Sequence, residues 1–78
     1  METMTRNHSC TDLAGTVHVS VSRGRHRHFW VSLRADGRVE VRDTSMTVTG
    51  RVVGRRDQPG APFRGSNDAR EAVMVALS

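Results

Sequence analysis

The chain has 78 residues, a length that allows one small domain whose core yields only a few kcal/mol of net stability. Its single cysteine, Cys10, excludes an intrachain disulfide, and no apolar run approaches the roughly 20 residues of a membrane span. The net charge of +4 includes 12 arginines and no lysine. Because a chain of this size often depends on a partner subunit, we expect a homodimer.

Residues 1–15 are polar and show no periodic pattern, which predicts a flexible N-terminal arm. The same segment lacks the apolar core of a signal peptide, and a lone cysteine fits a reducing compartment. We therefore expect a cytoplasmic protein without membrane association. The remaining residues, 16–78, are expected to form a single sheet-plus-helix domain.

From residue 16 onward, alternation of apolar and polar residues predicts β-strands that bury one face. A first strand over residues 16–22 and a second over 28–34 are expected to form a hairpin. The side chains predicted to point inward are Val17, Val19, Val21, Phe29, Val31 and Leu33. The alternation puts Trp30 on the opposite, open face.

The next residues extend the sheet. Asp36-Gly37 predicts a type I′ turn with positive φ at both positions, followed by a third strand over residues 38–42. A fourth strand is expected over residues 46–53, with Gly50 as a bulge. Its inward side chains would be Met46, Val48 and Val52.

The C-terminal residues predict a loop over 54–66, pinned to the core by Phe63, and then an amphipathic helix. Ser66, Asn67 and Asp68 are candidate N-caps, and Asp68 with Glu71 resembles a capping box. The predicted fold is therefore α+β: a three- to four-stranded antiparallel β-meander with one C-terminal helix packed on one face.

Two arginine clusters are candidate phosphate contacts. The first, at a hairpin tip, contains Arg23, Arg25 and Arg27, although a solvated turn explains it equally well. Arg23-Gly24-Arg25 also resembles a minor-groove hook in which His26 replaces the final proline. The second cluster contains Arg51, Arg55, Arg56 and Arg64. A simple up-down meander puts the two clusters at opposite ends of the sheet.

Trp30 is the only tryptophan, and the alternation surrounds it with basic side chains. Such a residue can form a stacking platform for nucleic-acid bases. Burial of the open face in a homodimer explains it as well. The neighbours expected on this face are His18, His28, Arg34 and Arg42.

The chain shows no catalytic or metal-binding signature. Cys-x-x-Cys and His-x3-His spacings are absent, and Cys10 has no positioned base in the sequence pattern. We therefore expect neither enzyme activity nor a metal or cofactor.

The C-terminal half also carries a family resemblance. Gly50-Arg51-Val52-Val53-Gly54-Arg55-Arg56, Pro59, Pro62, Asp68-Ala69-Arg70-Glu71-Ala72 and Ala76-Leu77 together resemble small dormancy-associated proteins of high-GC bacteria. Their sheet-plus-helix fold is likened to double-stranded-RNA-binding domains and ribosome hibernation factors. The resemblance implies a β-sheet homodimer that binds RNA or ribosomes under stress, without enzyme activity.

Two functional hypotheses follow. The first is a non-enzymatic, dimeric nucleic-acid or ribosome-binding protein in which Trp30 stacks on bases and six arginines contact phosphates: Arg23, Arg25, Arg27, Arg51, Arg55 and Arg56. The second is a protein-interaction module or inhibitor, such as a stress or phage-encoded regulator, that binds one host protein. It would use the open face or the Met74-Val75 flank of the helix.

Overall fold

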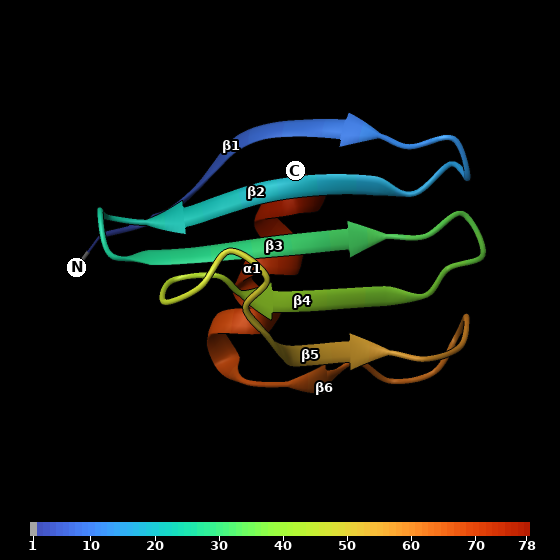
Figure 1. Cartoon of the computed structure of the whole chain (residues 1–78). Coiled ribbons are helices and arrows are strands. Elements are labelled where there is room, and N and C mark those ends of the chain that lie inside the picture. Colours follow the sequence, from blue (N-terminus) through green and yellow to red (C-terminus); the bar gives the residue numbers. More distant parts are fainter. Residues whose placement is uncertain (1) are drawn as a thin grey trace.

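In the computed structural model, the described residues, 2–78, form six strands and one helix. In chain order they are β1 (Met4–Thr11), β2 (Val17–Arg23), β3 (Arg27–Leu33), β4 (Val39–Asp43), β5 (Arg51–Arg56), β6 (Arg64–Gly65) and α1 (Asn67–Leu77). Each strand pairs antiparallel with the next, and α1 packs behind the sheet (Figure 1). The predicted α+β meander with a C-terminal helix is confirmed, but the predicted number of strands is too low.

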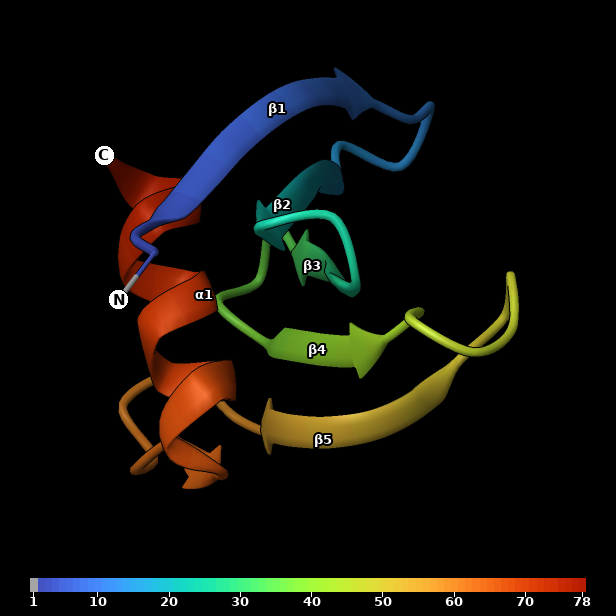
Figure 2. The ribbon, with the colours of Figure 1, turned by 90° about the vertical axis from the view of Figure 1, so that its left-hand side faces the viewer.

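The core lies between α1 and the face of the sheet that it covers (Figure 2). Alternation identified this face correctly, because the predicted inward side chains of β2 and β3 pack into the core. Alanines supply the buried residues of the helix, so that it lies close to the sheet. The buried apolar residues are Met4, Val19, Val21, Phe29, Val31, Val41, Ala69, Ala72 and Ala76.

The N-terminal segment is a strand, so the prediction of a flexible arm over residues 1–15 is wrong for Met4–Thr11. This strand, β1, pairs with β2 from Met4 opposite Arg23 to Thr11 opposite Val17. Met4 is its only buried residue, so backbone hydrogen bonds rather than an apolar face attach it to the sheet. A strand without a buried face carries no alternation for sequence reasoning to detect. Met1 lies outside the described residues.

The fourth predicted strand is misplaced, because β5 covers Arg51–Arg56 and residues 44–50 form a loop on the open side of the sheet (Figure 2). Met46 and Val48, which were expected to point inward, are 92% and 96% exposed. Gly50 is the turn residue of this loop, with φ +64°, and any side chain there would overlap the carbonyl of Asp43. The bulge lies instead at Val53, where the register shifts opposite Val41 and Arg42.

Asp36-Gly37 does close a hairpin, but the turn is not type I′. Gly37 has φ +93°, whereas Asp36 does not have a positive φ. The Arg34 amide donates to the Arg38 carbonyl at 2.9 Å, and the Gly37 amide donates to the Arg34 carbonyl at 3.0 Å. The loop therefore has three residues and needs only one left-handed position, which glycine fills.

The helix begins as the sequence suggested, at the first of the three candidate N-caps. Ser66 is the N-cap, and its Oγ accepts a hydrogen bond from the Ala69 amide at 3.1 Å. The predicted capping box is wrong, because Asp68 and Glu71 both pair with Arg23 instead. Just before the helix, the predicted loop contains the short strand β6, which pairs with β5. Phe63 packs against the core as predicted.

Candidate functional site

The open face of the sheet carries a depression of about 840 Å³, which we call the hollow. Its floor comes from β2, β3 and β4, and its borders come from the β1–β2 and β4–β5 loops, which both extend to this side of the sheet (Figure 2). A volume of this size is typical of a ligand site. The lining residues are Asp12, Ala14, Thr16, His18, Trp30, Ser32, Arg34, Glu40, Arg42, Thr44, Val48 and Thr49.

Trp30 lies at the centre of the floor, so its predicted place on the open face is confirmed. It stands opposite Ser20 on β2 and Arg42 on β4. The ring of His18, a diagonal neighbour, stacks on the indole with a centroid distance of 5.6 Å and an interplanar angle of 16°. The residue is half-buried, so part of the indole remains open to the hollow.

Two polar side chains, those of Asp12 and Ser32, hold the His18 ring in place. His18 Nε2 lies 3.0 Å from Asp12 Oδ2, and His18 Nδ1 lies 3.0 Å from Ser32 Oγ. A carboxylate only accepts, so Nε2 carries the proton and, in the neutral ring, Nδ1 accepts from the Ser32 hydroxyl. The hydrogen bond from His18, followed by one from the Thr16 amide, lowers the pKa of Asp12 below its ordinary value. Asp12 therefore stays charged.

A carboxylate, a histidine and a serine joined in this order also occur in nucleophilic triads. In those triads the carboxylate contacts Nδ1 and the hydroxyl contacts Nε2, whereas here Asp12 contacts Nε2 and Ser32 contacts Nδ1. Acyl transfer additionally needs hydrogen-bond donors for a developing oxyanion. The strand that carries Ser32, β3, is paired on both sides, so its backbone amides are used in the sheet. We interpret the hydrogen bonds with Asp12 and Ser32 as contacts that hold the His18 imidazole against Trp30.

Arg42 and Glu40 form the β4 side of the floor. Arg42 Nε lies 3.0 Å from Glu40 Oε1, and the Arg42 guanidinium also donates to the Thr49 carbonyl at 3.5 Å. This second contact ties the β4–β5 loop to the floor. With Arg34 and Asp12, the hollow is lined by two arginines and two carboxylates, so its formal charge is balanced when His18 is neutral.

A second, smaller depression of about 100 Å³ opens at the end of the sheet, beside the β3–β4 turn. We call it the arginine notch, because four arginines line it together with Val39, Glu40 and Asp57: Arg34, Arg38, Arg55 and Arg56. Strand pairing brings Arg55 opposite Glu40 and Arg56 opposite Val39. The notch shares Arg34 and Glu40 with the hollow, so the two depressions adjoin.

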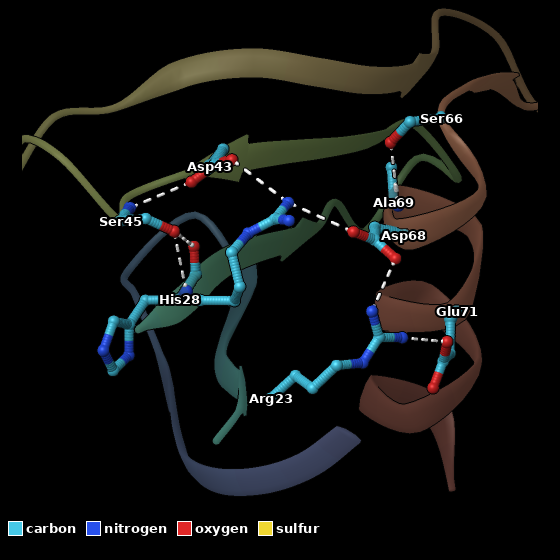
Figure 3. A network of polar contacts seen from close by, with 9 residues as sticks. Arg23, His28, Asp43, Ser45, Ser66, Asp68, Ala69 and Glu71 are labelled. Atoms are coloured by element: carbon cyan, nitrogen blue, oxygen red, sulfur yellow. Dashed lines mark hydrogen bonds and ion pairs between the residues drawn. The ribbon is translucent and has the colours of Figure 1, made fainter. Parts of the chain in front are cut away.

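Two arginines of the predicted hairpin-tip cluster form ion pairs with carboxylates of α1, and Figure 3 shows Arg23 directed toward the helix. Arg23 donates to Asp68 at 2.7 Å and also pairs with Glu71. Arg27 lies 3.1 Å from Asp68 and 3.5 Å from Asp43. These ion pairs join the β2–β3 tip to the first turns of α1.

Asp43 belongs to the same network. Partial burial raises its pKa, but hydrogen bonds from Ser45 and the charges of Arg27 and Arg51 outweigh that effect. The net result is a lowered pKa, which keeps Asp43 charged beside Arg27 (Figure 3).

The other predicted contact residues do not form two simple clusters. Arg25 is exposed at the β2–β3 tip. Arg51 stands opposite Asp43 at that same end of the sheet, whereas Arg55 and Arg56 lie at the far end, in the arginine notch. Grouping Arg51 with Arg55 and Arg56 was therefore wrong, because β5 runs the length of the sheet between them.

Sequence reasoning missed part of the site. Asp12 fell in the segment predicted as a flexible arm, so its contact with His18 was not expected. Glu40 alternates with Val39 and Val41 and therefore belongs to the Trp30 face, so the alternation itself could have identified it. The proximity of Arg34 and Arg38 follows directly from the β3–β4 hairpin, because these two residues flank its turn.

Comparisons with protein-family models, curated proteins and solved structures gave no match. Across residues 2–78, no three His, Cys, Asp or Glu side chains are grouped to hold a metal ion. In the same part of the chain, the helix lacks the length and apolar character of a membrane span. The resemblance to dormancy-associated proteins stays a prediction.

Proposed function

We propose that this protein is a non-enzymatic, cytoplasmic binding domain that takes single-stranded RNA or DNA on the open face of its sheet. The observation that carries the proposal is the half-buried Trp30, stacked on His18 at the floor of a hollow that adjoins the arginine notch. Single-stranded loops of ribosomal RNA belong to the same ligand class, so the ribosome role implied by the resemblance is included.

The physical basis is stacking combined with charge. A base that stacks on an aromatic side chain gains about 1–3 kcal/mol, whatever its identity. Arginines beside such a platform neutralise phosphates and make binding depend on salt. The stacked His18 and the hydrogen bonds to Asp12 and Ser32 limit the motion of the platform, which lowers the entropic cost of binding.

Single strands are favoured over duplexes for a geometric reason. In a duplex the bases are stacked on one another and their faces are not accessible, whereas unpaired bases can splay onto an aromatic residue. Trp30 lies on the floor of a hollow between two loops, where a flexible strand can reach it. Six arginines were predicted to contact phosphates. Arg55 and Arg56 line the notch beside the hollow, where they can reach the phosphates of a bound strand. Arg23 and Arg27 instead form ion pairs with Asp68 of the helix.

The test uses a short fluorescently labelled oligonucleotide and fluorescence anisotropy. We expect Trp30→Leu to weaken binding about tenfold or more, in line with the loss of one stacked base, and Trp30→Phe to retain part of the affinity. Met74→Ala, which changes an exposed residue of α1, is the matched control and should bind like the wild type. Equal affinity of Trp30→Leu and the wild type would overturn the proposal.

A second candidate is protein interaction, including homodimer formation, through the same face. It is favoured by Leu13, Met46 and Val48, which are exposed on the two loops that border the hollow, and by the balanced charge of the lining. Capture of one protein from extract that survives nuclease treatment, or a dimer mass in solution that Trp30→Leu reduces to a monomer, would support this candidate over the first.

A further inference from the structure

The arginine notch has a composition that the sheet itself does not require. Its arginines come from both sides of the β3–β4 turn and from the end of β5, and the strand pairing described above brings them together. Arg34 and Arg38 are exposed, as is Arg55, whereas Arg56 is half-buried. Four guanidinium groups around about 100 Å³ repel one another unless negative charge lies among them.

The acidic neighbours only partly supply that charge. Arg38 pairs with Asp36 at 2.8 Å, and Arg55 approaches Asp57 only to 4.0 Å. Within residues 2–78, Arg34 and Arg56 take part in no ion pair. Glu40 is paired with Arg42 in the hollow. The notch therefore keeps positive charge that the described residues do not neutralise.

Arg56 provides a second, independent indication that the notch binds an anion. Its Nε is buried and has no hydrogen-bond partner among residues 2–78. A buried donor without a partner costs free energy, and most such donors in proteins have one. The Nε of Arg23 is also unpartnered, but the terminal nitrogens of Arg23 are bound by Asp68 and Glu71. Arg56 lacks that compensation.

We propose that the arginine notch is a binding site for a tetrahedral oxyanion of the phosphate class. Guanidinium groups bind phosphate oxygens with paired, charge-assisted hydrogen bonds, and several of them around one small space match a group that offers three or four oxygens. This proposal rests on the proposed function only where it names a nucleic-acid strand as the source of the phosphate. Because the notch adjoins the hollow through Arg34, a strand with a base on Trp30 can present its terminal phosphate there.

The first arm of the experiment titrates inorganic phosphate into ¹⁵N-labelled protein and follows the arginine Nε–Hε signals by NMR. We expect saturable shifts at Arg56 and Arg34, and no comparable change at Arg25. The Arg34→Gln/Arg56→Gln variant should lose the saturable response, and Arg34→Gln alone, at an exposed position, covers the case in which the double variant does not fold. Equal small shifts at all arginines would mean that only general charge is sensed, and would overturn the site.

The second arm compares oligonucleotides with and without a 5′-phosphate or a 3′-phosphate. We expect one phosphorylated end to bind about fivefold to tenfold more tightly, a preference lost in Arg34→Gln/Arg56→Gln. The control variant Arg25→Gln/Arg51→Gln, which removes two exposed arginines from the opposite end of the sheet, should keep it. Phosphate binding without oligonucleotide binding would support the site and contradict the proposed function. Oligonucleotide binding without any phosphate response at the notch would do the reverse.

Discussion

Phe29 and Trp30 are neighbours in the sequence, but they face opposite sides of the sheet, and the two sides differ in how their side chains are used. On the covered side, Phe29 is buried, and Arg23 and Arg27, at the end of the β2–β3 hairpin, are paired with carboxylates. On the open side, Trp30 is half-buried in a hollow. The notch at the adjoining end of the sheet has two arginines without ion pairs among the described residues, Arg34 and Arg56. The position of an arginine in the folded sheet therefore indicates its role better than how many arginines cluster in the sequence.

The largest expected effect compares these two aromatic neighbours. Phe29→Ala removes a fully buried ring and should lower the free energy of unfolding by about 3–5 kcal/mol, which is most of the stability of so small a domain. Trp30→Leu should cost much less, because the indole is only half-buried. Urea denaturation followed by circular dichroism measures both. Equal losses of stability would mean that Trp30 belongs to the core and not to a site.

A smaller effect on stability distinguishes Arg23, which is paired with the helix, from Arg25, which is exposed at the same hairpin tip. Arg23→Gln breaks the contacts with Asp68 and Glu71, so the midpoint of thermal unfolding should fall by a few degrees while oligonucleotide affinity stays unchanged. Arg25→Gln, two residues away and exposed, should leave the midpoint near that of the wild type. If Arg23→Gln weakened binding and left the midpoint intact, Arg23 would be a nucleic-acid contact after all.

The smallest effect concerns the Asp12–His18 contact on the open side. Because the pKa of Asp12 is lowered in the folded state, the unfolded state takes up a proton first as the pH falls. The stabilisation is therefore complete above the ordinary value of 3.8 and is lost as the pH drops through the folded pKa. Asp12→Asn removes this contribution.

The measurement is the difference in unfolding midpoint between the wild type and Asp12→Asn as a function of pH. The wild type should be the more stable protein near neutrality, and the difference should vanish in strong acid. Asp36 and Asp43 also have lowered pKa values, but they are present in both proteins and cancel in the difference. A difference that does not change with pH would exclude the charged contact as its cause.

Sequence reasoning succeeded where side chains alternate between a buried and an exposed face. That condition holds for β2 and β3, and it placed Phe29 in the core and Trp30 on the open face. It failed for β1, which is held by backbone hydrogen bonds that leave no mark on side-chain polarity. It also failed for residues 46–50, because Met46 and Val48 alternate like strand residues and are in fact exposed on a loop.

The candidate site was predicted only in part for the same reason. The Trp30 face followed from alternation, but the contact of Asp12 with His18 depends on β1 and its loop, and the notch depends on the register between β4 and β5. Register is set by turn geometry and by the bulge at Val53. Pairing of Arg23 with a helix 45 and 48 residues away was likewise beyond local patterns.

Binding of single strands on the open face is tested most directly by the emission of Trp30 during titration with a single-stranded oligonucleotide and with its duplex, at low ionic strength. As the only tryptophan, it reports on the hollow alone. We expect a saturable change with the single strand, a much weaker one with the duplex, and a loss of both as salt is added. Emission that does not change with either ligand at low salt would contradict such binding.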